Sequence, residues 1–324
     1  MKKTFKVLLG AAVLVTEVFA LALPILTTSV KADGHPIQAI THAGFGGGTD
    51  VTTRMMLLRT RRYLKQDMQL VNKKGGGGAA SMDYMMTLPA DGQHTLTWTT
   101  GHAVSMALGK TKVKLSDMQP LARGTDDPQL FVVNCKNDIK DAKKFISAQK
   151  SKSLKYGTTH VGGIDDVSAI AFTKKGKLTD PTIVAYKGVA PIKTNLIKGD
   201  IDVGVLNLGE AVTEIEDGTL CVSVVLASKR MDKLSNVPTA TELGIPVVLS
   251  TVRGFVTRKG VPADRKKQLE DAMIKAMEHK YFQSFLTDIG LDSSSVVGAD
   301  EWGKQMEVML AEMTAQLKAL GYIK

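Results

Sequence analysis

The chain has 324 residues, of which 44% are hydrophobic and 5% aromatic, and its formal net charge is +10 at pH 7. The length suffices for two domains with a buried core each. The basic balance favours an anionic partner. Because the lysines are scattered and lack neighbouring aromatic stacking residues, we expect that partner not to be nucleic acid.

The first 32 residues have the pattern of a secretory leader. Three lysines among the first six residues precede a mostly apolar run from Val7 to Leu26, and Val30-Lys31-Ala32 resembles a signal peptidase site. A retained membrane anchor is the alternative, which Pro24 and the cleavage-like site disfavour. We therefore expect residues 1–32 to be a signal peptide cleaved near Ala32, and the mature protein, from Asp33 on, to be periplasmic.

Beyond the leader, short apolar runs alternate with segments of helical periodicity. The runs predict buried strands at 37–41, 68–71, 95–99, 129–133, 154–157, 182–185, 202–206 and 220–227. Helical spacing is found at 51–58, 145–149, 167–171, 192–196 and 208–215, and two further helices are expected from 263 and around 302–320. This βαβ alternation predicts an α/β fold with largely parallel sheets that are covered on both faces.

The two cysteines, Cys135 and Cys221, both lie in apolar runs that predict strands. Two isolated cysteines do not form a disulfide framework, so we expect two buried, reduced thiols. A disulfide between them is the alternative in an oxidising compartment.

Signatures of common enzyme sites are incomplete in this sequence. Gly44–Thr49 resembles a dinucleotide fingerprint, but Thr49 takes the sixth position and Val71-Asn72 stands where an acidic residue belongs. Gly109-Lys110-Thr111 lacks the first glycine of a P-loop. The six histidines show no metal-ligand spacing, and no serine lies in a nucleophile elbow. We therefore expect a protein that is not an enzyme and that uses no cofactor and no metal ion.

Turns rich in glycine and hydroxyl groups follow several predicted strands. In an open α/β sheet, the loops beyond the carboxyl ends of the strands line the ligand site, and N–H groups at a helix start hold an anion. Each turn taken alone is also compatible with an ordinary tight turn. The candidate ligand-binding residues are Phe45, Gly46, Gly47, Gly48, Thr49, Asp50, Gly77, Gly78, Thr100, Thr158, Thr159, His160 and Asn207.

Two of these residues carry more specific expectations. Gly47 is expected to allow a carboxylate to approach closely, or to supply backbone angles that the turn needs. Asp50 stands at a helix start, where an acid usually caps the helix, and it is also a candidate for contact with the ligand or its water.

Short motifs in a fixed order give the chain a family resemblance. It is similar to the receptors of tripartite tricarboxylate transporters, the Bug or TctC-like family, over essentially the whole mature chain. The motifs are Gly46–Asp50 with Arg54, Asn72–Gly78, Pro89–Gly92, Tyr156–Thr158, Tyr186–Pro191, Gly199–Asp202, Arg230, Val237–Thr239, Glu242–Gly244 and Arg253–Phe255.

The resemblance implies a two-lobed, type II-like periplasmic binding protein with two mixed, mostly parallel sheets and a ligand cleft between the lobes. Lobe 1 is expected over 33–131 and 253–324, and lobe 2 over 132–252. A small organic carboxylate would be gripped by the first-strand loop and by the loop after Tyr156-Gly157, and a monomeric receptor would deliver it to polytopic permease subunits. A receptor for a signalling system and, less favoured, an exported enzyme on the same scaffold are the alternatives.

The chain departs from the family pattern at several positions. Gly163 stands where a serine is usual and Asp166 where a histidine is frequent, and both belong to the second carboxylate loop. Lys74, Val71 and Cys221 replace a common proline, glutamate and arginine. The identity of the ligand is therefore open at the second loop.

Overall fold

The computed structural model describes residues 35–159, 161–319 and 321–324. The expected signal peptide, its cleavage near Ala32, and the candidate residue His160 lie outside the described residues. In the described part of the chain, no helix has both the length and the apolar character that a membrane crossing requires.

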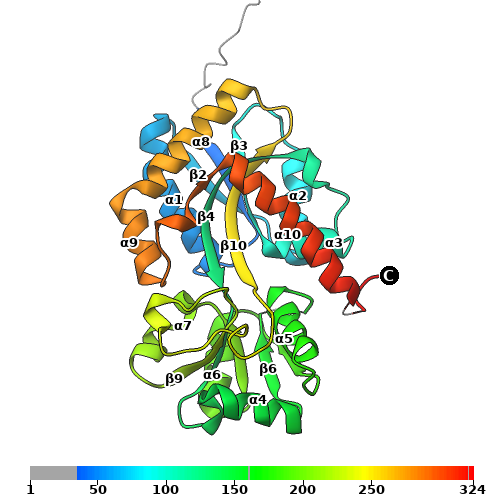
Figure 1. The fold of residues 1–324 in the computed structure, drawn as a ribbon. Helices are drawn as coiled ribbons and strands as arrows, with labels where there is room; N and C mark the ends of the chain where they lie inside the picture. Colours follow the sequence, from blue (N-terminus) through cyan, green and yellow to red (C-terminus); the bar gives the residue numbers. More distant parts are fainter. Residues whose placement is uncertain (1–34, 160, 320) are drawn as a thin grey trace, which may run out of the picture. The chain divides into compact units, whose positions relative to one another are not determined.

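The first sheet has the strand order β11-β4-β10-β3-β1-β2 (Figure 1). Strand β1 pairs in parallel with β2 and β3, whereas β10 runs antiparallel to both β3 and β4, and β11 is antiparallel to β4. The strands are β1 Ile37–Thr41, β2 Met68–Asn72, β3 His94–Thr99, β4 Met118–Pro128, β10 Ser250–Arg258 and β11 Val297–Gly298. The helices of this half are α1 Gly48–Leu64, α2 Ala79–Met86, α3 Thr100–Ala107, α8 Ala263–Glu278, α9 Lys280–Asp288 and α10 Ala299–Ala319.

The second sheet has the order β7-β6-β8-β5-β9. Strand β6 is parallel to β7 and β8, and β5 is antiparallel to β8 and β9. Its strands are β5 Leu130–Asn134, β6 Lys155–Thr158, β7 Thr182–Ala185, β8 Val203–Leu206 and β9 Leu220–Val225, and its helices are α4 Ala142–Ser151, α5 Ile164–Lys175, α6 Val189–Lys198 and α7 Leu208–Glu216. The two sheets with their helices form the two lobes of an α/β binding-protein fold.

The chain passes between the sheets twice, at neighbouring places. Strand β4 continues through Gln129 into β5, and the return path enters β10 after Leu249; the two strands run side by side (Figure 1). The Gln129 N–H donates to the Leu249 carbonyl at 2.9 Å, and the Gln129 side chain donates to Thr251 Oγ1 at 2.6 Å. These bonds join the two connections where they leave the first sheet.

Aromatic side chains of both halves belong to one hydrophobic cluster. In the first, Trp98 on β3 meets Trp302 on α10 edge to face at 5.7 Å between ring centroids. Gly254 on β10 makes this packing possible, because a Cβ there would lie 2.3 Å from the indole of Trp302. In the second half, Phe131 contacts the ring of Phe172 at 4.9 Å between centroids. Such buried aromatic pairs stabilise a core beyond the area they bury.

The predicted strands are confirmed, with ends shifted by at most two residues, and each predicted helical segment overlaps a helix whose ends differ from it by up to six residues. Strands β4, β10 and β11 and helices α2, α3 and α9 were not predicted. Strand β4 has the sequence MQPLARGTDDP, in which a proline, a glycine and two aspartates interrupt any apolar run. Strand β10 likewise carries buried Arg253 and Thr257. Polar residues inside these strands hide them from a search for apolar patterns.

The expectation of two reduced cysteines is wrong, because Cys135 and Cys221 form a disulfide. Cys221 lies on β9 opposite Val133 of β5, and Cys135 follows β5 directly. The antiparallel pairing of these strands brings the two Cα atoms to 5.0 Å, within the usual range for a disulfide. The disulfide joins residues 86 positions apart, and no local sequence pattern predicts it.

Candidate ligand-binding site

The loop from β1 to α1 is held by its own aspartate. Gly46 has a positive φ of 75°, which favours glycine, and its N–H donates to Asp50 Oδ2 at 3.0 Å. Arg54 Nε donates to the same oxygen at 2.8 Å. Burial disfavours the charged form of Asp50, but the hydrogen bonds from Arg54 and Gly46 outweigh it and lower the pKa of this carboxyl. Asp50 therefore fixes the loop to the first turn of α1.

The loop from β6 to α5 repeats this local structure in the other half. Gly162 has a φ of 68°, and its N–H donates to Asp166 Oδ2 at 2.6 Å, again four residues further on. Asp50 and Asp166 are each the third residue of their helix. The residues before the two glycines, Phe45 and Val161, are 74% and 69% exposed. The two halves thus present two copies of one glycine turn, each leading into a helix.

Both helices begin without a side-chain cap. Gly47 precedes α1 and Gly163 precedes α5, and neither helix start receives a side-chain hydrogen bond at that position within the described residues. The N–H groups of the first turn are then available to an outside acceptor at the positive end of the helix. The backbone at Gly47 is extended, with φ −72°, so the expectation that this residue supplies unusual angles is wrong, and Gly46 has that role.

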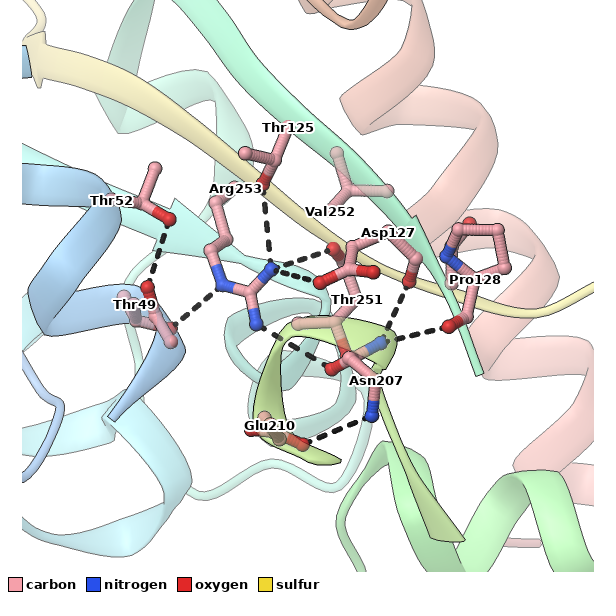
Figure 2. Close-up of polar contacts among 12 residues, drawn as sticks. Thr49, Thr52, Thr125, Asp127, Pro128, Asn207, Glu210, Thr251, Val252 and Arg253 are labelled. Atoms are coloured by element: carbon pink, nitrogen blue, oxygen red, sulfur yellow. Dashed lines mark hydrogen bonds and ion pairs between the residues drawn. The ribbon is translucent and has the colours of Figure 1, made fainter. Parts of the chain in front are cut away.

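Arg253 on β10 connects elements of both halves (Figure 2). Its Nη1 lies 3.1 Å from Asp127 Oδ2 on β4, and its Nε lies 3.3 Å from Thr49 Oγ1 on α1. Its Nη2 lies 3.5 Å from Oδ1 of Asn207, the residue before α7. Asn207 in turn donates from Nδ2 to the carbonyls of Asp127 and Pro128. A single guanidinium thus brings together two of the sequence-predicted residues, Thr49 and Asn207.

The guanidinium lies directly against the start of α1. A Cβ placed on Gly48 would be 2.7 Å from Arg253 Nη2, so a side chain at Gly48 would displace it. The positive guanidinium and the uncapped N–H groups of α1 therefore face the same small region. Both contributions favour an anion, with the charge of the guanidinium partly balanced by its ion-pair partner Asp127.

Two carboxyl groups interact with the guanidinium: Asp127 forms an ion pair with it, and Glu210 interacts with its charge. Burial raises the pKa of Asp127 to about 6 although Arg253 opposes the shift. Burial also raises the pKa of Glu210 to about 7; the N–H of Asn207 and the charge of Arg253 oppose this shift, and Asp165 and Asp127 add to it. Glu210 Oε2 accepts from the Asn207 N–H at 3.0 Å (Figure 2). With these pKa values, both carboxyl groups change protonation state near neutral pH.

The predicted site residues Gly77, Gly78 and Thr100 contact other residues of the protein. A Cβ on Gly78 would lie 2.7 Å from His102 Cδ2, and Thr100 Oγ1 donates to the Ser250 carbonyl at 2.9 Å. His102 is bonded to Thr99 and Ser81, and burial, with the charge of His42, lowers its pKa well below the ordinary value. Gly77 belongs to the same turn as Gly78, and the Gly77 carbonyl accepts a hydrogen bond from the Ser105 hydroxyl. These contacts shape α2 and α3 around a buried imidazole.

In the second loop, the structure places Thr158 and Thr159 in different surroundings. Thr158 is fully buried, and its hydroxyl has no hydrogen-bond partner among the described residues. Thr159 donates to Asp165 Oδ2 from its N–H at 2.9 Å and from its hydroxyl at 2.6 Å. The side chain of Asp165 therefore uses donors that the sequence assigned to the ligand.

Arg253, Asp127, Asp165 and Glu210 were missing from the predicted site. Arg253 stood in a family motif but received no role, and Asp127 lies in a strand that was not predicted. The spacing Asn207-x-x-Glu210 is that of a capping box, which the structure confirms and which was a usable signal for Glu210.

Two open α/β sheets joined by two neighbouring connections, with uncapped helix starts next to them, define a solute-binding protein. The chain belongs to the family of tripartite tricarboxylate transporter receptors. The family model described as "Tripartite tricarboxylate transporter family receptor" matches residues 52–320. Proteins of this family are periplasmic receptors, not enzymes.

Individual relatives agree with this assignment. The chain is 26% identical to Protein BugT of Bordetella pertussis over 233 residues, which are 68% of this chain and 70% of BugT. MatC of Rhodopseudomonas palustris, solved with bound malate, shares the fold with a TM-score of 0.77 at 23% identity, over 87% of this chain and 98% of MatC. Another R. palustris protein, solved with adipate, has a TM-score of 0.79 at 21% identity, over 90% and 99% of the two chains.

Proposed function

We propose that this protein is an extracytoplasmic receptor that binds a small organic carboxylate and delivers it to a tripartite tricarboxylate-type membrane transporter. The observation that carries the proposal is the guanidinium of Arg253 beside the uncapped start of α1. It is supported by the bound malate and adipate of the two R. palustris proteins with the same fold. The leader-like residues 1–32 support a periplasmic location after cleavage near Ala32.

The carboxylate would bind at the first loop. The N–H groups of Gly48 and Thr49 and the hydroxyl of Thr49 are its proposed donors, with the remaining candidates from Phe45 to Asp50 around them. Charge-assisted hydrogen bonds contribute about 1.5–3 kcal/mol each, so four or five of them offset the cost of association and give about micromolar binding.

The second loop would complete the site. We place Thr158–His160 and Asn207 there, with Gly77, Gly78 and Thr100 supporting the first lobe. Lobe 1 would comprise 33–131 and 253–324 and lobe 2 would comprise 132–252, and the two would close on the ligand by hinge motion at β4 and β10. The closed monomer then presents its surface to the permease subunits.

Calorimetry on ligand-free protein tests this function. The titrants are small mono-, di- and tricarboxylates, with neutral sugars and organic cations as comparison. We expect at least one carboxylate to bind with about micromolar affinity or better. Binding only to sugars or cations would contradict the proposal.

A further inference from the structure

The end of α1 carries a row of exposed side chains that is mostly cationic. These side chains recur at spacings of three or four residues, so they share one side of the helix. They are Leu58, Arg61, Arg62 and Lys65. Arg61 and Arg62 lie in the last turn of α1, and Lys65 is its C-cap.

The start of α9 adds a further cation next to this row. The guanidinium carbon of Arg59 on α1 lies 4.7 Å from the ring centre of Tyr281, and Lys280 Nζ lies 5.7 Å from the centre of the same ring. Partial burial lowers the pKa of His279, and the positive charges of Arg59, Lys280 and Arg62 lower it further. We call the cations of the two helices the basic face: Arg59, Arg61, Arg62, Lys65 and Lys280.

The protein does not neutralise the basic face. Among the residues that the structure describes, none of its cations forms an ion pair with a carboxylate. Cations in the last turn of a helix interact favourably with its dipole, which accounts for Arg61 and Arg62. Lys280, however, is the first residue of α9, where a cation is unfavourable. Helix stability therefore does not explain the whole basic face.

Large apolar side chains are interspersed with these cations. Leu58, Tyr63 and Tyr281 are 48%, 45% and 49% exposed. Leucine and aromatic residues beside lysine and arginine are typical of surfaces that lie at the boundary of a bilayer, where the cations meet anionic headgroups and the apolar groups enter the interface. An acidic protein segment would match the cations but would leave the apolar groups without a partner. The residue set therefore favours a membrane.

The described chain begins beside the basic face. Gln66 follows Lys65 directly, and its Nε2 donates to the His35 carbonyl at 2.8 Å. The Ile37 N–H donates to the Asp67 carbonyl, also at 2.8 Å. The leader-like sequence ends at Ala32, shortly before His35. A chain tethered to a membrane through this leader would therefore hold the end of α1 close to the bilayer.

We propose that the basic face docks on a membrane that contains anionic lipids, with Leu58, Tyr63 and Tyr281 entering the headgroup region. Each lysine or arginine near such a surface adds to the attraction, which salt screens. Arg61 lies about 20 Å along α1 from Gly48, where the proposed carboxylate site is. The inference goes beyond the proposed function and does not depend on it.

Co-sedimentation with lipid vesicles tests the docking. The protein is isolated from its native host in the form found there, and every variant shares its N-terminus. The vesicles contain phosphatidylcholine alone or an equimolar mixture with the anionic phosphatidylglycerol. We expect binding to the mixed vesicles alone. This binding should be lost when salt is raised from about 0.1 M to about 1 M, because the Debye length falls from about 10 Å to about 3 Å.

A pair of double variants locates the surface. Arg61→Gln with Arg62→Gln removes two exposed cations from the basic face, and we expect affinity for the mixed vesicles to fall at least about fivefold. Lys150→Gln with Lys152→Gln is the matched control, because it removes the same charge from exposed positions at the end of α4. We expect the control to change the affinity by less than about twofold. Thermal unfolding checks that both double variants are folded.

Three results would overturn the inference. They are the absence of binding to the mixed vesicles, equal binding to both kinds of vesicle, and an equal loss of affinity in the two double variants, which would indicate attraction by net charge alone. If a polyglutamate peptide binds through Arg61 and Arg62 while the vesicles do not bind, the partner is an acidic protein segment and the membrane proposal is wrong. Calorimetry with carboxylates is a separate measurement, so the proposed function stands or fails independently.

Discussion

Arg253 and Asp127 form an ion pair, 3.1 Å between Nη1 and Oδ2, in which each side chain is only 4% exposed. The two residues lie on β10 and β4, the strands that lead from the first sheet toward the second. Burying two charges is costly, and their attraction offsets the cost only when further hydrogen bonds satisfy the remaining groups. Here Thr49, Thr125 and Asn207 supply such bonds to the guanidinium.

Removing one partner of the Arg253–Asp127 ion pair should destabilise the protein more than replacing both partners. We expect Asp127→Ala to lower the free energy of unfolding by about 3–5 kcal/mol, because it leaves the guanidinium buried and without its counter-charge. The double variant Asp127→Ala with Arg253→Met should lose less than Asp127→Ala alone. Urea denaturation of the wild-type protein, Asp127→Ala, Arg253→Met and the double variant measures this, and a double variant that loses the sum of both single effects would show that the two residues are not coupled.

Glu210 should make stability depend on pH. Its pKa is raised from 4.5 to about 7 in the folded protein, so between these values the folded state binds more protons and stability falls as pH rises. Glu210→Gln lacks this cost but can still accept from Asn207. We expect the variant to match the wild-type protein at about pH 4 and to exceed its unfolding free energy by about 3 kcal/mol at about pH 8.

Asp127, with a pKa raised to about 6, titrates in both proteins, and the variant also lacks the repulsion between Asp127 and Glu210, which adds to the same difference. Urea denaturation at the two pH values provides the measurement. If the difference in unfolding free energy between Glu210→Gln and the wild-type protein does not increase as pH rises, Glu210 keeps its ordinary pKa.

The disulfide should contribute to stability by closing a long loop. Cys135 and Cys221 are 86 positions apart, and a bridge across such a loop restricts the unfolded chain. We expect the double variant Cys135→Ala with Cys221→Ala to lose about 2–4 kcal/mol of unfolding free energy. Thiol titration of denatured, unreduced wild-type protein is the companion measurement. Two reactive thiols in protein from its own compartment would contradict the disulfide.

The order of strands and helices could be predicted because the βαβ units carry apolar runs and helical spacing. The two connecting strands could not, since β4 and β10 place Thr125, Asp127 and Arg253 in the interior. Those same strands supply half of the candidate site, so the guanidinium was missed with them. The turn of Gly46 to Asp50 was visible in the sequence, and its copy from Gly162 to Asp166 has the same spacing, Gly-Gly-x-x-Asp.

The disulfide and the hydrogen bonds that Thr159 donates to Asp165 could not be predicted from the sequence, for another reason. Cys135 meets Cys221 only through the register of β5 with β9, and Asp165 takes the donors of Thr159 only once α5 has formed. Both depend on where separate elements meet, which local propensity does not encode.

Thr49 should contribute directly to affinity. Thr49→Val removes a hydroxyl that accepts from Arg253 and is a proposed donor to the ligand, and we expect binding to weaken by about 1–3 kcal/mol. Thr60→Val is the matched control, because the hydroxyl of Thr60 is buried in the same helix and donates only to Met56. Calorimetry with the tightest-binding carboxylate should show the loss in the first variant alone. Equal affinities in both variants would remove Thr49 from the site.

Gly47→Val tests whether the first turn of α1 binds the carboxylate. The backbone at Gly47 is extended, and a Cβ there would lie 3.4 Å from the Gly44 carbonyl, so the turn can accept a side chain. The valine would nevertheless place apolar bulk at the uncapped helix start. Calorimetry and thermal unfolding are measured on the same preparation. We expect a folded, monodisperse protein without detectable carboxylate binding, and wild-type affinity in that folded variant would contradict binding of the carboxylate at the first turn of α1.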